Sequence, residues 1–193
     1  MRGYMNHIGI DFDDTLVDMR KSIVKLLNKI HNKNWDYEEM VEYGVSDLYG
    51  YSFEAFVDYF TNNQKELHSA KPYPFLIDVL SELSKTSKLS IMTGRPKAWM
   101  NSAELWVVKN KLPIDDIVCA SEYINGKPEC AFIHNVTLFI EDNPTHALSI
   151  ANSGIDVLLL DKPYNQMCKH ERITKVKDWE QVGRLLLSYG FYK

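Results

Sequence analysis

The sequence predicts an α/β protein with a doubly wound, Rossmann-like parallel sheet and a small helical cap inserted after the first strand. Short apolar runs alternate with segments of helical periodicity along most of the chain. Acidic or polar residues directly follow three of those runs. Between the first run and residue 71 the alternation stops, and the chain becomes rich in aromatic residues. These three observations define the fold class.

The first predicted strand, residues 8–10, stops abruptly at the carboxylates of Asp11, Asp13 and Asp14. Two like charges about 4 Å apart repel by roughly 4 kcal/mol at an effective dielectric of about 20. Such a cluster is typical of a site where a cation neutralises the acids, or where one acid stays protonated. Oxygen ligands favour a hard cation such as Mg²⁺. Because Asp-x-Asp also occurs in glycosyltransferases and in solvated turns, the pattern needs support from elsewhere in the chain.

The next segment is predicted to be helical. Apolar residues recur at helical spacing over residues 15–31, which predicts an amphipathic helix. Residues 35–60 hold much of the aromatic content of the chain, and the phenylalanines of residues 53–60 follow the spacing of a helix face. Glycines divide this region into short pieces.

This helical region suggests a division of the chain into two parts. We expect residues 17–70 to form the small helical cap, closed by the proline-containing segment 71–74. The α/β core domain would then consist of residues 1–16 and 71–193. A chain of 193 residues is long enough for one sizeable core and such an inserted module.

From residue 75 onward the alternation is regular. Apolar runs predict strands at residues 88–92, 117–119, 137–140 and 156–160. Helical spacing predicts helices at residues 76–83, 99–107, 144–153 and 179–189. Gly154 is a typical residue to end the third of these helices.

Composition limits the functional classes. A formal net charge of −4 argues against an extended nucleic-acid-binding surface, which would need a basic excess. No apolar run is long enough to span a membrane, and the N-terminus lacks the apolar core of a signal peptide. Cys119, Cys130 and Cys168 lack metal-ligand spacing and are expected to be thiols in a reducing compartment. The expected location is the cytoplasm.

The polar clusters are expected to meet at one place. In a doubly wound sheet the carboxyl ends of the strands form the edge where ligands bind. Residues 11–14, 93–95 and 141–142 each follow a predicted strand and would lie at that edge. Taken singly, Thr-Gly-Arg could be a turn with a helix cap, and Glu-Asp could complement a helix dipole. Their coincidence at one edge favours a functional site.

These clusters resemble the motifs of the haloacid dehalogenase-like (HAD) phosphohydrolases. Residues 11–16 (DFDDTL) are similar to the first motif of the family, and residues 93–95 (TGR) to the second. Lys127 matches the third motif by its place between the third and fourth strands, although a solvated turn lysine is the alternative. Residues 141–142 are similar to the fourth motif. The likeness covers nearly the whole chain and implies an HAD-type sheet with strand order five-four-one-two-three.

The resemblance implies a magnesium-dependent phosphatase. Asp11 would attack phosphorus and form an aspartyl-phosphate. Asp13 would protonate the leaving oxygen and later deprotonate the hydrolytic water. The expected Mg²⁺ ligands are the Asp11 carboxylate, the Asp13 backbone carbonyl and Asp142, with Glu141 acting through a bound water.

The resemblance also implies a phosphate-binding set. The Thr93 hydroxyl and the Gly94 amide would hold phosphate oxygens, and Lys127 would balance their charge in the transition state. Arg95 is expected to bind phosphate at the rim of the site, with a salt bridge facing the following helix as the alternative.

A narrower likeness concerns the substrate. Residues 140–144 (IEDNP), 160–166 (LDKPYNQ) and the segment 172–180 are similar to the 5′(3′)-deoxyribonucleotidase branch and its bacterial and phage relatives. Many members carry two aspartates in the fourth motif, whereas this chain has Glu141 at the first of these positions. The expected substrate is a small phosphomonoester, a (deoxy)nucleoside monophosphate cleaved by a 5′-nucleotidase activity. Cap aromatics would stack on its base or simply form the core of the cap. A homodimer is left open.

Other functions remain as alternatives. A phosphatase for a sugar phosphate or a polynucleotide 3′-phosphate would use the same core. A non-catalytic HAD-fold interaction module would not need the full set of acids, all of which are present. A nucleotide-binding Rossmann protein would carry Gly-x-Gly-x-x-Gly after the first strand, and that motif is absent.

Overall fold

The architecture is a single parallel sheet with helices on both sides, seen in a computed structural model that describes residues 6–63 and 70–188. Within these residues the strands are β1 (Asn6–Ile10), β2 (Ser87–Thr93), β3 (Asp116–Cys119), β4 (Leu138–Glu141), β5 (Asp156–Leu160) and β6 (Ile173–Val176). All neighbouring pairs are parallel, and the order across the sheet is β3-β2-β1-β4-β5-β6. The predicted doubly wound α/β sheet and its order five-four-one-two-three are confirmed.

The edge strand β6 was not predicted from the sequence. It extends the predicted order by pairing with β5, from Val157 opposite Ile173 to Leu160 opposite Val176. Of its own residues only Val176 is fully buried. Inner parallel strands show continuous apolar runs because both of their faces are covered, whereas a short polar edge strand lacks that pattern.

Residues on each strand alternate between two cores. Ile8 and Ile10 point into the larger core, together with alternate residues of β4 and β5. Phe139 of β4 points the other way, into the smaller core. Gly9 lies beside this ring, and a Cβ atom there would come within 2.6 Å of it. The missing side chain at Gly9 is therefore what makes room for Phe139 against β1.

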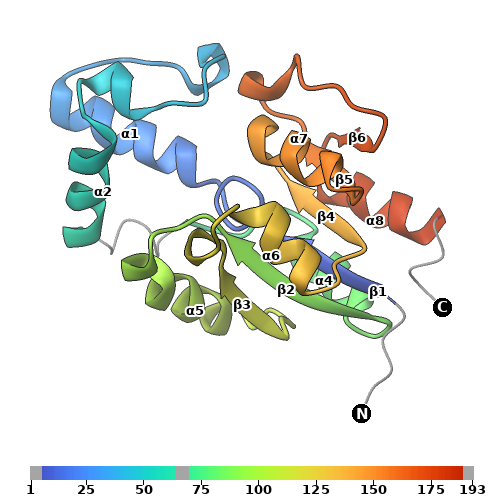
Figure 1. The fold of residues 1–193 in the computed structure, drawn as a ribbon. Coiled ribbons are helices and arrows are strands. Elements are labelled where there is room, and N and C mark those ends of the chain that lie inside the picture. Colours follow the sequence, from blue (N-terminus) through green and yellow to red (C-terminus); the bar gives the residue numbers. More distant parts are fainter. Residues whose placement is uncertain (1–5, 64–69, 189–193) are drawn as a thin grey trace.

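Helices cover both faces of the sheet, as Figure 1 shows. The larger core receives side chains from α4 (Leu76–Leu83), α5 (Met100–Lys109) and α8 (Trp179–Ser188). The smaller core receives them from α6 (Lys127–Ile133) and α7 (Pro144–Asn152). The predicted core helices agree with these bounds to within a few end residues, and predicted residue 189 lies outside the described residues. The seven-residue α6 is too short to be recognised by its periodicity.

The segment between β1 and α4 is helical and lies at the carboxyl end of the strands, shown in blue and cyan in Figure 1. It contains α1 (Met19–His31), α2 (Phe53–Asn62) and the 3₁₀ helices η1 (Tyr37–Glu39) and η2 (Ser46–Tyr49). Short 3₁₀ helices η3 (Lys97–Trp99), η4 (Ala120–Glu122) and η5 (Pro163–Asn165) lie elsewhere. Some aromatics, such as Tyr49, pack in a small cluster of this segment itself. We call residues 17–70 the cap. The division of the chain into a cap and a core domain remains a proposal.

Helix α1 begins at Met19, so the prediction of a helix from residue 15 is wrong at its start. Asp14 has a left-handed backbone conformation with φ of 59°, which interrupts helical geometry. The Asp14 N–H donates to the Val17 carbonyl at 2.8 Å and forms a tight turn. Asp18 then caps α1 by accepting a hydrogen bond from the Lys21 N–H. This turn directs the chain out of the sheet and into the cap.

Two expectations from composition can be compared with the structure. Cys119, Cys130 and Cys168 are all buried free thiols, as expected. Among the described residues, none of the helices is both long and apolar enough to cross a membrane.

Candidate active site

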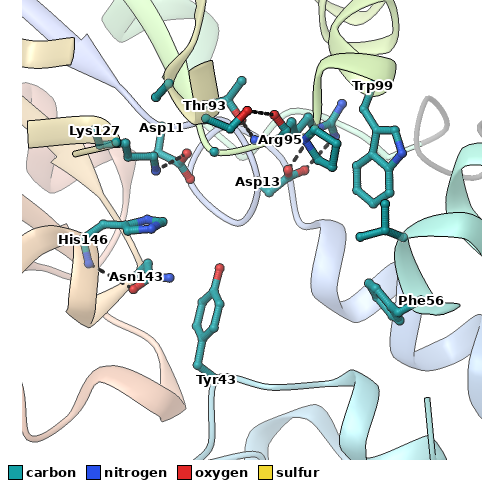
Figure 2. Close-up of a pocket in the computed structure, with 16 residues that line it drawn as sticks. Asp11, Asp13, Tyr43, Phe56, Thr93, Arg95, Trp99, Lys127, Asn143 and His146 are labelled. Carbon is teal, nitrogen blue, oxygen red and sulfur yellow. Dashed lines mark hydrogen bonds and ion pairs between the residues drawn. The ribbon is translucent and has the colours of Figure 1, made fainter. Parts of the chain in front are cut away.

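A cavity of about 450 Å³ lies where the cap meets the carboxyl edge of the sheet. Figure 2 shows the core side chains on one side of it and Tyr43 pointing toward them from the cap. The residues that line it include six of the predicted site residues: Asp11, Asp13, Thr93, Gly94, Arg95 and Lys127. The two remaining ones, Glu141 and Asp142, are 0% and 1% exposed and lie beneath the cavity surface. The sheet therefore brings the four sequence motifs together at one edge.

Asp11 follows the central strand directly. Its N–H donates to the Ile140 carbonyl at 2.9 Å, which continues the pairing of β1 with β4 by one residue. Its Oδ1 accepts a hydrogen bond from Lys127 Nζ at 2.5 Å. The end of β1 thus fixes the backbone of Asp11, and a cation from a different element fixes its side chain.

Lys127 is buried, so the alternative of a solvated turn lysine is wrong. It is the first residue of α6 and only 4% exposed. Its Nζ lies between Asp11 Oδ1 at 2.5 Å and Glu141 Oε2 at 2.6 Å. Burial alone would lower the pKa of Lys127, but these two carboxylates raise it above its usual value. Lys127 therefore carries a positive charge at the floor of the cavity.

Glu141 ends β4 and is held on both oxygens. Its Oε2 accepts from Lys127, and its Oε1 accepts the N–H groups of Asp142 and Asn143 at 3.1 Å each. Burial, together with repulsion from Asp11, raises the pKa of Glu141 to about 7 despite Lys127. Glu141 therefore fixes the position of Lys127 and of the turn after β4.

Asp142 is oriented by hydroxyl groups from two distant parts of the chain. Its Oδ1 accepts from Thr15 Oγ1 at 3.0 Å, and its Oδ2 from the Tyr164 hydroxyl at 2.5 Å. Asn165 donates to the Asp142 carbonyl at 2.8 Å. Burial, followed by repulsion from Glu141 and Asp11, raises the pKa of Asp142 well above its usual value.

Tyr164 and Asn165 were not predicted as site residues. They lie in 160–166, the segment quoted for the nucleotidase likeness, so the sequence signal was present without a role attached. The structure supplies that role, because both side chains hold Asp142. Tyr164 also stacks on the Arg20 guanidinium, 4.1 Å from the ring centre, and meets Tyr43 of the cap edge-on.

The acids at the floor of the site fit a hard divalent cation. One carboxylate oxygen each from Asp11, Glu141 and Asp142 lies within 4.8 Å of the others, and all three residues are buried. Lys127 forms ion pairs with two of these carboxylates, Asp11 and Glu141, so the three acids carry an excess of negative charge when ionised. Oxygen donors and an excess of negative charge are the chemistry that Mg²⁺ requires of a site.

Asp13 and Asp14 have different partners and point in different directions. Asp13 points to the cavity with 30% of its side chain exposed, and both of its oxygens accept from Arg95. Asp14 turns away and accepts from the backbone and guanidinium N–H groups of Arg20. Of the clustered acids in the first motif, only Asp11 and Asp13 face the cavity.

The second motif forms the opposite end of the same floor. Thr93 ends β2 and is 1% exposed, and its Oγ1 accepts the Arg95 N–H at 3.1 Å. Gly94 borders the cavity, where a Cβ atom would reach ordinary contact distance from His146 and Lys127. The predicted phosphate-binding residues therefore lie together, although the Arg95 side chain is directed to Asp13.

Tyr43 and Phe56, from the aromatic segment 35–60, also line the cavity. Trp99, Asn143 and His146 line it as well and were not predicted as site residues. His146 lies in the first turn of α7, and its buried Nδ1 has no hydrogen-bond partner among the described residues. Burial, then repulsion from Lys127, lowers the pKa of His146 to about 4, so the ring is neutral near pH 7. No motif marks a lone histidine of this kind, because only the folded sheet edge brings it to the site.

Comparison with known proteins gives the same family as the motifs. The sequence profile of the haloacid dehalogenase-like hydrolases matches residues 8–160. A Bacillus subtilis protein provisionally named as a nucleotidase, YqfW, is 30% identical over 182 residues, which cover 91% of this chain and 90% of that protein. The nucleotidase CA_C3379 of Clostridium acetobutylicum is 25% identical over 177 residues, covering 91% of each chain.

Solved structures agree at the level of the fold. The magnesium-bound HAD hydrolase YfnB of Bacillus subtilis superposes with a TM-score of 0.65 at 16% identity, covering 95% of this chain and 99% of that one. The profile covers well over half of this chain, and the matched range contains the residues of all four motifs. The chain therefore belongs to the haloacid dehalogenase-like hydrolases and is an enzyme of that family.

Proposed function

We propose that this hydrolase is a magnesium-dependent phosphomonoesterase that cleaves (deoxy)nucleoside monophosphates through an aspartyl-phosphate on Asp11. The observation that carries the proposal is the pairing of the Asp11 carboxylate with the buried Lys127 at the floor of a cavity that also contains Asp13. A carboxylate fixed in place beside a permanent cation is suited to attack an anionic phosphate group.

The first step would transfer the phosphoryl group to Asp11. An Asp11 oxygen forms the new bond to phosphorus as the bond to the ester oxygen breaks. Asp13 gives its proton to that leaving oxygen, and a partly exposed side chain two residues from the nucleophile suits this role. Lys127, the Thr93 hydroxyl and the Gly94 amide would stabilise the charge on the other phosphate oxygens.

The second step would release phosphate from Asp11. Asp13, now a carboxylate, takes a proton from water as the water oxygen attacks phosphorus, and the Asp11 carboxylate leaves. The acid of the first step is thus the base of the second, and its proton returns for the next cycle.

The Asp11 and Asp142 carboxylates and the Asp13 backbone carbonyl would hold Mg²⁺, and Glu141 would act through a bound water. When bound, the ion supplies the positive charge that lets a carboxylate approach a phosphate dianion. In the structure, Thr15 and Tyr164 orient Asp142, and Lys127 orients Asp11. Such supporting contacts commonly hold ligating oxygens in place for a metal.

The nucleotide preference is supported by the cap and by the names of the relatives. Tyr43 and Phe56 of the cap and Trp99 of the core place aromatic surface on the cavity, which a nucleobase could contact. The curated relatives described above are named as nucleotidases. Buried free thiols fit a reducing compartment, so we also propose a cytoplasmic location. A homodimer stays a prediction.

A phosphate-release screen tests the function. We expect nucleoside monophosphates to be hydrolysed far faster than sugar phosphates of equal charge. EDTA should abolish the activity, and added Mg²⁺ should restore it, because the floor acids need a cation to admit the substrate. Equal rates on nucleotides and sugar phosphates would contradict the nucleotide preference alone. Full activity in EDTA would contradict the metal dependence.

The cap aromatics provide a second prediction. Replacing Phe56 by alanine should raise KM for nucleoside monophosphates about tenfold and leave p-nitrophenyl phosphate little changed, because stacking on a base contributes about 1–3 kcal/mol. Trp35→Ala is the matched control, since Trp35 is an exposed cap aromatic outside the cavity. Steady-state kinetics on both substrates give the measurement. An equal loss on both would mean that Phe56 only supports the cap.

A further inference from the structure

The proposed proton shuttle, Asp13, is gripped by a single arginine. Arg95 Nε donates to Asp13 Oδ2 at 2.8 Å, and Arg95 Nη2 donates to Asp13 Oδ1 at 2.6 Å. Two parallel hydrogen bonds of this kind fix the plane of a carboxylate as well as its position. A carboxylate has about four lone-pair sites, so each oxygen keeps one free. The Asp13 side chain remains 30% exposed.

Arg95 is itself held rigidly. Its side chain is 2% exposed, and its guanidinium carbon lies 4.2 Å from the ring centre of Phe12. The remaining nitrogen, Nη1, donates to Ser102 Oγ at 2.8 Å, and this hydroxyl in turn donates to the Trp99 carbonyl. All three guanidinium nitrogens therefore have partners within the fold, in the turn after β1 and in α5.

These contacts differ from those of an arginine reserved for phosphate. A phosphate-binding guanidinium directs its fork at the ligand, whereas this fork is directed at a neighbouring carboxylate. Exposed ion pairs contribute little to stability, because solvent screens them and ordering two long side chains costs entropy. The buried Arg95 is already fixed by its other contacts, so holding Asp13 costs little further side-chain entropy. Holding a catalytic group in one geometry is a recognised source of rate enhancement.

Resting on the function proposed above, we propose that Arg95 is a positioning residue. Its fork holds the Asp13 carboxyl group toward the leaving-group oxygen, and Phe12 and Ser102 hold the fork. Arg95 then acts on catalysis through Asp13, and the phosphate oxygens are bound by Thr93, Gly94 and Lys127. Loss of the fork lets Asp13 rotate, so proton delivery to the leaving oxygen fails while phosphate binding persists.

Leaving-group dependence distinguishes positioning from phosphate binding. Phenyl phosphate and p-nitrophenyl phosphate are similar in shape, but phenolate is the poorer leaving group. Cleavage of phenyl phosphate therefore depends more strongly on protonation of the leaving oxygen. The value of kcat/KM reports the first irreversible step, the transfer to Asp11, so it contains the contribution of the acid. We expect Arg95→Lys, which keeps the charge but loses the fork, to lower kcat/KM for phenyl phosphate at least about tenfold more than for p-nitrophenyl phosphate.

Three further variants make the test specific. Asp13→Asn should show the same substrate dependence, and the double variant should be no worse than Asp13→Asn on phenyl phosphate, because both changes remove one function. Ser102→Ala removes only the hydrogen bond that anchors Arg95 Nη1, so it should show the same leaving-group dependence in weaker form. This variant provides the test if Arg95→Lys fails to fold. Lys97→Ala removes a 78% exposed cation of the same segment and should leave the ratio unchanged.

Inhibition by inorganic phosphate separates the outcomes. For a positioning residue, Arg95→Lys should leave the inhibition constant within about threefold of the parent, because the phosphate ligands are intact. Equal losses on both substrates together with weakened phosphate inhibition would overturn the inference and make Arg95 a phosphate ligand. If Asp13→Asn itself lacks leaving-group dependence, the acid–base role in the proposed function fails instead. A Ser102→Ala variant without any trend, next to a misfolded Arg95→Lys, would also count against the inference.

Discussion

Asp11→Asn is expected to lower phosphate release on the order of 10⁴-fold or more, while the protein stays folded. Asparagine has almost the shape of aspartate but lacks the charge that attacks phosphorus. Asp11 is one of three buried acids whose oxygens lie within 4.8 Å of one another, and removing its charge relieves repulsion with Glu141 and Asp142. The variant should therefore melt at the same temperature as the parent or above it when EDTA is present.

The measurement is phosphate release at saturating Mg²⁺, next to a thermal melt in EDTA. Asp78→Asn is the matched control, because Asp78 is an exposed aspartate on α4, away from the cavity. Near-normal turnover in Asp11→Asn would remove Asp11 as the nucleophile. Loss of the folded state would show that this carboxylate is structural, which its burial beside like charges argues against.

Lys127→Met is expected to remove activity and stability together. Turnover should fall about 10³-fold or more, because the phosphate loses a fixed cation in a desolvated site. In EDTA the free energy of unfolding should fall by about 3–5 kcal/mol, the cost of leaving the charged partners of a broken buried pair uncompensated. Lys127 bridges Asp11 and Glu141 and is 4% exposed, so its removal strands two acids at once.

The stability loss should depend on pH in a definite direction. Burial already raises the pKa of Glu141 to about 7, and without Lys127 it rises further. A carboxyl group with a raised pKa in the folded state keeps its proton there and stabilises the fold at low pH. That contribution is lost as the pH rises, so the variant should lose more stability at about pH 8 than at about pH 6. Urea unfolding in EDTA at both pH values gives the measurement.

Lys97→Met is the control for this change, because the ion pair that Lys97 forms with Glu122 is exposed. A Lys127→Met protein as stable as the parent at both pH values would mean that the acids find other partners. Retention of activity would mean that a different cation, not Lys127, balances the phosphate charge.

The core sheet could be predicted from the sequence because its signals are local. An inner parallel strand is covered on both faces, so residues such as 156–160 form continuous apolar runs that stop where the strand stops. The acids of the first and fourth motifs follow such runs directly, and parallel strands bring their carboxyl ends to one edge by topology alone. The position of Asp11, Asp13 and Asp142 at this edge could therefore be predicted from the sequence.

The tertiary structure alone decided which side chains serve those acids. The sequence singled out Lys127 only by its place between two predicted strands. The packing of α6 against the sheet shows that it is buried between Asp11 and Glu141. The short edge strand β6 stayed hidden because it is half exposed and polar. Arg95 lies 82 residues along the chain from its partner Asp13, and Tyr164 lies 22 residues from its partner Asp142. Hydrogen bonds and ion pairs between distant segments depend on side-chain direction and burial, which no local periodicity records. For this reason the sequence determined the fold and the position of the acidic motifs, while the tertiary structure decided which side chains hold those acids in place.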